Sequence, residues 1–336
     1  MGQRKMTLRR ASALTAHVAV FILAVIALFG NVAKLKVSVT APLDRKVAAK
    51  GLPFMVELKN FTVEEYPGSS PDHFDPKQFT SELQLTSADG TVHDLVVSVN
   101  HPAAVGAWRF YQSGYDVAAG KESRYSIILA VRDPMWPAAC AALWMMMASA
   151  LLLMTGSVPE GKDRKWLWTG TGVLFVLFVY WVISKLGIGA RNLRPALRSP
   201  WFIPHIVAYM FAYATLTAAA IYAIVLWARN SRHPADSART LALDRLTRFG
   251  WSFFTLGMMM GALWAKEAWG DYWTWDPKET WALATWTGYL VYIHLTGRIK
   301  DRPTAYALLL LSFLLLQMCW YGVNFLPTSA ASLHTY

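Results

Sequence analysis

A tryptophan-dense segment and several histidines are the parts of this sequence whose residue types could bind a ligand. The segment Trp269-Gly270-Asp271-Tyr272-Trp273-Thr274-Trp275-Asp276-Pro277-Lys278-Glu279-Thr280-Trp281 holds four tryptophans and one tyrosine in 13 residues. Flat, rigid, apolar rings can form a platform for a large planar ligand. Aromatic residues also gather at membrane surfaces for purely interfacial reasons, and that alternative stays open here.

Four of the eight histidines form two sets by their depth in apolar segments. If these segments are helices that cross a membrane, His17 and His294 each lie a few residues from the inner end of their helix. At the rise of a helix, both are then roughly 6 to 9 Å from the inner membrane boundary. His205 and His334 lie near the other boundary, on the side of the tryptophan segment. Axial ligation of haem iron requires two neutral imidazoles on opposite faces of a flat macrocycle, and an aromatic cleft suits the porphyrin. We therefore predict an outer pair, His205 and His334, and an inner pair, His17 and His294.

Simpler interpretations of these histidines remain open. A helix–helix hydrogen bond would satisfy His17 or His294, and solvent would satisfy His334. The other four histidines have no ligand-like spacing and are interpreted as surface residues: His73, His93, His101 and His233. Cys140 and Cys319 also lack metal or redox spacing, and the sequence has no C-x-x-C-H motif. The chain is therefore not itself a c-type cytochrome.

Charged residues near the tryptophan segment have two expected roles. Porphyrin propionates need cations, and three lie on the same outer side: Arg191, Arg194 and Arg198. Asp276 and Glu279 could act as acid or base, but their spacing around Pro277 predicts a capping box that opens the next helix. With no other candidate acid or base, any catalysis would consist of positioning.

Membrane helices are the elements that must position these residues. The chain has 336 residues, 55% of them apolar, and the apolar residues gather into seven uncharged blocks of about 17 to 28 residues. A helix needs roughly 20 such residues to cross the hydrocarbon layer, so we predict seven membrane helices and exclude an ordinary soluble enzyme. The blocks are 11–33, 135–156, 166–184, 201–228, 249–265, 281–297 and 303–326.

The distribution of basic residues predicts the orientation. With the N-terminus inside, the short inner segments carry fifteen Lys and Arg residues and the short outer loops carry five. This bias follows the positive-inside rule and accounts for the net charge of +11 without a nucleic-acid partner. We therefore predict a multi-pass membrane protein, anchored by an uncleaved first helix, with the tryptophan segment on the outer face.

One long outer segment, between the first two apolar blocks, differs in composition from the rest of the chain. Stretches rich in Val, Ile, Tyr and Phe alternate there with turn residues, which predicts short strands. The predicted strands are 54–61, 79–86, 91–99, 108–115 and 125–131, and Asp89-Gly90 is the strongest hairpin signal. The predicted fold class is an α-helical polytopic membrane protein of about seven helices, with a small external antiparallel β domain between the first and second.

The tryptophan segment resembles a known signature. Together with the helix that ends Tyr289-Leu290-Val291-Tyr292-Ile293-His294-Leu295, it is similar to the WWD signature of haem-handling proteins of cytochrome c biogenesis. Its form W-G-x-x-W-x-W-D-P-K-E-T-W is most similar to the CcsA (ResC) branch of System II, the Ccs pathway. Ser199-Pro200-Trp201 before His205 and Gly322-Val323-Asn324-Phe325 before His334 are similar to that branch's two external histidine sites.

The outer β segment is similar to the partner subunit of that pathway, CcsB (ResB). The similar stretches are Phe79 to Leu85, Val99-Asn100-His101-Pro102 and Phe110-Tyr111-Gln112-Ser113-Gly114-Tyr115-Asp116. The resemblance implies a fusion with four parts. They are an N-terminal anchor at 1–34, a ResB-like external β domain at 35–134, the second helix with an inside loop at 135–164, and a CcsA-like bundle at 165–336 that carries the WWD loop at 269–281.

The resemblance also implies a function and a set of binding residues. Haem b would be carried across a bacterial cytoplasmic (inner) membrane to its outer, periplasmic face as a substrate. There it would be joined to apocytochrome c, as in a cytochrome c haem lyase. His205 and His334 would be its outer axial ligands and His294 an inner one, with His17 as the second inner ligand. The other residues expected to bind haem are Trp269, Trp273, Trp275, Asp276 and Trp281.

Partners and alternatives follow from the same resemblance. The implied partners are apocytochrome c with its C-x-x-C-H motif, a thiol reductant protein, membrane lipid and a Ccs companion subunit. Two other functions remain open at this stage. One is a membrane b-type electron-transfer cytochrome, and the other is a haem exporter without ligase activity.

Overall fold

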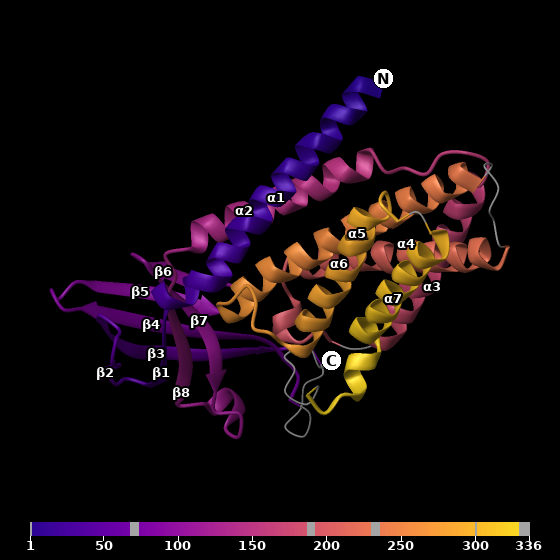
Figure 1. Ribbon diagram of the computed structural model, residues 1–336. Helices are drawn as coiled ribbons and strands as arrows, with labels where there is room; N and C mark the ends of the chain where they lie inside the picture. The colour runs from indigo at the N-terminus through magenta and orange to yellow at the C-terminus, as the bar shows by residue number, and fades with distance from the viewer. Residues whose placement is uncertain (1, 68–73, 187–191, 230–235, 300, 329–336) are drawn as a thin grey trace.

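The protein is a bundle of long helices with a β sandwich at one end (Figure 1). The computed structural model describes residues 2–67, 74–186, 192–229, 236–299 and 301–328. The long helices are α1 (Gly2–Ala33), α2 (Trp136–Thr155), α3 (Arg164–Leu186), α4 (Phe202–Ala228), α5 (Asp236–Trp269), α6 (Pro277–Leu295) and α7 (Arg302–Trp320). Short 3₁₀ helices lie in the connections: η1 (Gly120–Glu122), η2 (Pro195–Leu197) and η3 (Gly322–Phe325).

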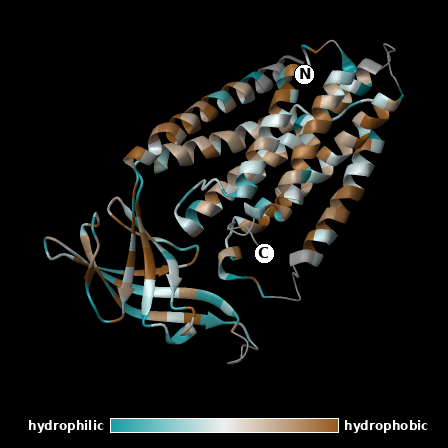
Figure 2. Cartoon of the chain, turned by 60° about the horizontal axis from the view of Figure 1, so that its bottom comes forward, coloured by the Kyte–Doolittle hydropathy of each residue, from teal (hydrophilic) through white to brown (hydrophobic). Residues whose placement is uncertain are grey.

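Among the described residues, five helices are long and apolar enough to cross a membrane: α1, α2, α3, α4 and α7. Their apolar residues stand out in Figure 2. The two shortest predicted blocks, 249–265 and 281–297, form helices within α5 and α6, but these helices are not among the five. Both blocks contain several Trp and Gly residues, which contribute little hydropathy. The prediction of seven membrane helices is therefore confirmed for five.

Helices α4 and α5 pack closely because α5 presents glycine to α4. A Cβ on Gly257 would lie 3.1 Å from the ring of Tyr209, and a Cβ on Gly261 would lie 2.7 Å from the ring of His205. Small residues at a helix interface let two backbones approach each other. The Gly257-x-x-x-Gly261 pair thus brings α5 against the face of α4 that carries Tyr209 and His205.

The β domain consists of two four-stranded antiparallel sheets, ordered β1-β8-β7-β6 and β2-β3-β4-β5. The strands are β1 (Leu35–Pro42), β2 (Val47–Ala48), β3 (Phe54–Glu65), β4 (Pro76–Ser87), β5 (Val92–Ser98), β6 (Ala103–Val105), β7 (Trp108–Tyr115) and β8 (Tyr125–Arg132). Buried residues of both sheets, among them Leu58, Phe110 and Ile128, form one core. The five predicted strands are confirmed as β3, β4, β5, β7 and β8, with Asp89-Gly90 in the turn between β4 and β5.

The first and last strands of the sandwich, β1 and β8, lie side by side. Strand β1 starts one residue after α1, β8 ends shortly before α2, and the two strands pair with Leu35 opposite Arg132. Helices α1 and α2 consequently also pack against each other (Figure 1). The sandwich is thus inserted between two neighbouring helices.

The sandwich is docked on the end of the bundle that carries the tryptophan loop, residues 269–281. Tyr66 donates a hydrogen bond to the carbonyl oxygen of Leu193 at 3.0 Å. Asn100 donates to the carbonyl oxygens of Pro195 and Ala196, at 2.9 and 3.1 Å. These bonds tie β-domain loops to the connection that leads into α4.

Candidate functional site

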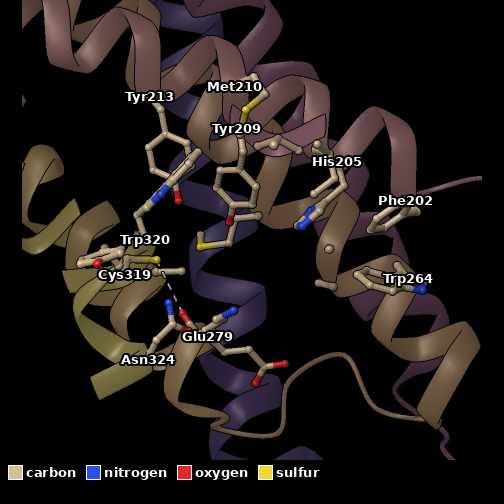
Figure 3. Close-up of a pocket in the computed structure, with 18 of the residues that line it drawn as sticks. Phe202, His205, Tyr209, Met210, Tyr213, Trp264, Glu279, Cys319, Trp320 and Asn324 are labelled. Atoms are coloured by element: carbon tan, nitrogen blue, oxygen red, sulfur yellow. Dashed lines mark hydrogen bonds between the residues drawn. The ribbon is translucent and has the colours of Figure 1, made fainter. Parts of the chain in front are cut away.

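A cavity of about 590 Å³ lies between α3, α4, α5, α6 and α7, beside the tryptophan loop (Figure 3). Its wall is mostly aromatic, with Phe202, Tyr209, Tyr213, Trp264, Trp273 and Trp320 among the lining side chains. A small number of polar groups also reach it: His205, Lys278, Glu279 and Asn324. Apolar walls with a few convergent polar groups, in this range of volume, are typical of cofactor-sized ligand sites.

The predicted outer ligand His205 lies in the wall of this cavity. Its half-buried ring makes an edge contact with Tyr209, with 4.8 Å between ring centroids, and lies 5.9 Å from Trp264. Nδ1 of His205 lies 2.8 Å from the carbonyl oxygen of Gly257 on α5. Because a carbonyl only accepts, Nδ1 carries the proton and the neutral ring keeps its lone pair on Nε2. Hydrogen bonds of this kind orient histidines that bind metals.

Sequence reasoning missed the two glycines that make this arrangement. Gly257 supplies the carbonyl oxygen that orients the His205 ring, and Gly261 leaves the space that the ring fills. The available signal was the G-x-x-x-G spacing on α5, which is typical of close helix packing in membranes.

The predicted capping box at the start of α6 is confirmed. Asp276 is the N-cap and accepts a hydrogen bond from the backbone N–H of Lys278 at 2.9 Å. Glu279 reaches back to accept from the N–H of Asp276 at 3.2 Å and from the N–H of Thr274 at 2.7 Å. Both carboxylates therefore hold the shape of the loop, and Asp276 is buried at the helix end rather than in the cavity wall.

The structure separates the four tryptophans that were predicted to bind one ligand. Of these described side chains, Trp273 alone lines the cavity. Trp269 packs on Trp264, with 5.4 Å between ring centroids, and Trp281 packs against the bundle core. Trp275 is 63% exposed and has a φ of +60°, a strained conformation for a bulky residue. The loop is thus a folded edge of the cavity rather than a flat platform.

Among the described residues, the cation in the cavity wall is Lys278, in the first turn of α6, and not Arg194 or Arg198. Arg194 lines a second, smaller cavity between the β domain and the bundle, and Arg198 donates to the carbonyl oxygen of Lys77 in β4 at 3.3 Å. Arg191 lies outside the described residues.

The predicted inner pair comes together between α1 and α6. The ring centroids of His17 and His294 are 6.0 Å apart and their planes are 74° apart. In each ring Nδ1 bonds to the carbonyl oxygen four residues earlier, of Ala13 at 2.6 Å and of Leu290 at 2.9 Å. Because a carbonyl oxygen accepts, Nδ1 is the donor in both rings, and the Nε2 atoms are the candidate ligand atoms. Both residues are exposed on the surface of the bundle.

The second predicted outer ligand, His334, lies outside the described residues. The chain that leads toward it passes the cavity, since Cys319, Trp320 and Asn324 all line the wall. Cys319 is buried, with Sγ 3.8 Å from the carbonyl oxygen of Lys278. Its position in the cavity wall was not predicted.

Comparisons with known proteins match both parts of the chain. A family model described as cytochrome C assembly protein matches residues 126–330, and a ResB-like family model matches residues 3–155. The chain is similar to proteins named cytochrome c biogenesis protein CcsA. That of Guillardia theta is 36% identical over 44% of this chain and 57% of the relative, and that of Chlamydomonas reinhardtii is 37% identical over 44% and 43%.

A third such protein, from Prochlorococcus marinus subsp. pastoris, is 34% identical over 49% of this chain and 62% of the relative. The chain thus spans about half the length of the curated relatives that it matches. The assembly-family match covers more than half of the chain, including α2 to α7 and the whole cavity. This multi-pass membrane protein therefore belongs to the cytochrome c assembly protein family, with a ResB-like N-terminal part.

Proposed function

We propose that this chain handles haem in cytochrome c biogenesis: it carries haem b across a bacterial cytoplasmic membrane and presents it to apocytochrome c at the outer face. The observation that carries this proposal is the aromatic cavity with His205 in its wall, its ring oriented by the carbonyl oxygen of Gly257. A volume of about 590 Å³ suits a cofactor-sized ligand. The relatives are named for cytochrome c biogenesis, which agrees with a haem-binding cavity.

The proposed topology has seven membrane crossings with the N-terminus inside. Helices α5 and α6 would be the two additional crossings, since they run within the same bundle as the five apolar helices (Figure 1). The proposed parts are the anchor 1–34, the β domain 35–134, the second helix and inside loop 135–164, and the bundle 165–336. The β domain and the tryptophan loop would then share the outer face, as the positive-inside bias predicts.

At the outer site, His205 and His334 would ligate the haem iron from opposite faces. Trp273 would contact the macrocycle, and Lys278 would pair with a propionate, replacing the arginines as the expected cation. Trp269, Asp276 and Trp281 would hold the loop in place, and the exposed Trp275 would meet the incoming substrate.

Attachment would need no acid or base from this chain. Each thiol of the C-x-x-C-H motif adds across one vinyl group, so that sulfur bonds to one carbon, hydrogen goes to the other, and nothing leaves. The chain's residues would position the vinyl groups near the thiols and keep water out of the cavity. The substrate thiols must be reduced, and Cys140 and Cys319 lack the spacing of a redox-active pair that could reduce them. A separate thiol reductant protein would therefore serve this step, and a Ccs companion subunit would be a further partner.

At the inner site, His17 and His294 would hold haem before it moves outward. Metal–imidazole bonds are about 2 Å long, so ring centroids 6.0 Å apart are compatible with two ligands of one iron. The exposure of both rings supports entry from the side, between α1 and α6.

Co-expression of this chain with a C-x-x-C-H apocytochrome tests the proposal. Wild-type protein should yield covalent haem on the cytochrome, His205→Ala should abolish it, and added imidazole should restore it. His101→Ala, at an exposed position of the β domain, is the matched control and should retain wild-type yield. Haem that reaches the outer face without thioether formation would support an exporter instead, and an unchanged yield with His205→Ala would refute the proposal.

A further inference from the structure

Five charged side chains gather where the β sandwich joins the bundle. Lys34 and Lys36 belong to the segment that enters the sandwich, Asp133 to the segment that leaves it, Lys266 to the end of α5, and Asp271 to the tryptophan loop. Both Lys34 and Lys36 pair with the carboxylate of Asp271. Lys266 donates to Asp133 at 2.8 Å. The network therefore joins the two ends of the sandwich to the loop beside the cavity.

Most of this network is buried. The side chain of Lys266 is 3% exposed, those of Lys34 and Asp133 are 11% exposed, and that of Asp271 is 15% exposed. Burial alone would raise the pKa of Asp271, but Lys34 and Lys36 outweigh it and hold that pKa below its ordinary value. The Asp271 carboxylate thus stays charged, and a buried charge is stable only while its partners are present.

The residues next to Asp271 connect this network to the cavity. Lys266 also donates to the carbonyl oxygen of Gly270 at 3.0 Å, and its amine lies 5.0 Å from the ring centroid of Tyr272. Tyr272 stacks on Trp136, with 5.7 Å between ring centroids and 15° between planes. Tyr272 and the following residue, Trp273, both line the cavity. Asp271 is therefore one residue away from the cavity wall on one side and held by the sandwich on the other.

We propose that Asp271 is a positioning residue of the haem site, through which Lys34 and Lys36 of the ResB-like part fix Tyr272 and Trp273 in the cavity wall. This inference rests on the proposed function, because it takes the cavity to be where haem binds. Lys34 immediately precedes β1 and Lys36 lies within it, so a displacement of the sandwich acts directly on Asp271. The ResB-like part thereby sets how tightly the cavity holds its ligand.

The experiment compares haem binding by the purified wild-type chain, by His205→Ala and by four further variants. Asp271→Asn removes the charge, Asp271→Glu keeps it, and Lys36→Gln removes the more exposed of its two partners, which is 42% exposed. Glu64→Gln breaks the exposed pair with Lys77 on the β domain and is the matched control. The measurements are haem affinity, the haem absorption spectrum with and without imidazole, and hydrogen exchange of the paired strands β1 and β8.

Asp271→Asn should weaken haem binding roughly tenfold, of the order seen when a group that orients a ligand is lost, and change the spectrum. Asp271→Glu and Glu64→Gln should remain close to wild type, and Lys36→Gln should lie between. Imidazole should rescue haem binding by His205→Ala, because it replaces the missing ligand. It should not rescue Asp271→Asn, because His205 is still present there and only the loop is displaced. A wild-type affinity and spectrum in Asp271→Asn, alongside a clear loss in His205→Ala, would overturn this inference alone.

Two further outcomes are decisive. If His205→Ala also binds haem normally, the proposed function fails and this inference fails with it. If hydrogen exchange shows that Asp271→Asn has lost the pairing of β1 and β8, its weaker binding would reflect unfolding. The haem affinity of Lys36→Gln then tests the inference. A weaker affinity in that folded variant supports the positioning role, and an unchanged affinity overturns it.

Discussion

The imidazole of His205 occupies the space into which a side chain at Gly261 would project. A Cβ at that position would lie 2.7 Å from Cε1 and 2.9 Å from Nδ1 of the ring. One turn earlier on the same helix, the carbonyl oxygen of Gly257 accepts the ring's hydrogen bond. One face of α5 therefore makes room for the proposed ligand and also orients it.

Gly261→Ala is expected to displace the His205 ring and break its hydrogen bond to Gly257. Overpacking of this kind typically costs about 1 to 3 kcal/mol of stability, and haem binding should fall as in His205→Ala. Haem content and thermal stability of the purified protein measure the effect. Gly172→Ala on α3, where a Cβ meets nothing within 4 Å, is the control and should be neutral or stabilising. Equal haem content in the two variants would argue against the tight fit.

Asp276→Ala should destabilise the protein by about 1 kcal/mol through loss of the cap of α6, whereas Asp276→Asn should be tolerated because Asn caps equally well. Asp301→Ala removes a similar cap from α7, where Asp301 accepts from the N–H of Thr304 at 3.1 Å. It should lower stability to a similar degree but leave cytochrome yield per folded protein unchanged. Thermal melting and yield are the measurements, and a loss of yield in Asp276→Asn would show that the charge itself is needed.

Alanine at either His17 or His294 should remove haem from the inner site. If the two rings share one iron, the double variant should be no worse than either single variant, since residues that act as a pair are not additive. Haem bound per chain measures this. Losses that simply add in the double variant would mean that the two histidines act independently.

Tyr111 should make the stability of the β domain sensitive to alkaline pH. Burial raises the pKa of its hydroxyl from 10.0 to about 12, with Asp133 and Asp271 adding to the rise and Arg109 opposing it. The unfolded chain loses this proton first, so the contribution is complete below pH 10 and is lost as pH rises to about 12. Chemical denaturation across this range should show a shallower decline for Tyr111→Phe than for wild type, and identical slopes would contradict the assignment.

Much of the secondary structure could be predicted from local patterns. Asp89-Gly90 marked the hairpin because the turn demands a positive φ, which Gly90 has at +86°. The spacing of Asp276, Pro277 and Glu279 specified the cap of α6 for similarly local reasons. The meeting of His17 and His294 was also predicted, because equal depth in a membrane restricts where two residues can lie.

The parts that could not be predicted depend on contacts between elements. Helices at α5 and α6 were expected from their apolar blocks, but the cavity that they border depends on how they pack with α3, α4 and α7. Arg194 and Lys278 are both cations near the loop, and only the docking of the β domain decides which faces the cavity. Strand β1 follows α1 without a turn, so no turn-forming residue in the sequence indicated where the strand begins.

The pairing of β1 with β8 has a consequence for how this architecture can diversify. The first and last strands of the sandwich are adjacent, so without the sandwich a short turn could connect α1 to α2. A larger or smaller outer domain could be inserted at the same position. Any replacement would have to keep the charged contacts at this junction, made by Lys34 before its first strand, Lys36 within that strand and Asp133 after its last strand. It would also have to replace the hydrogen bonds by which Tyr66 and Asn100 dock the sandwich on the bundle.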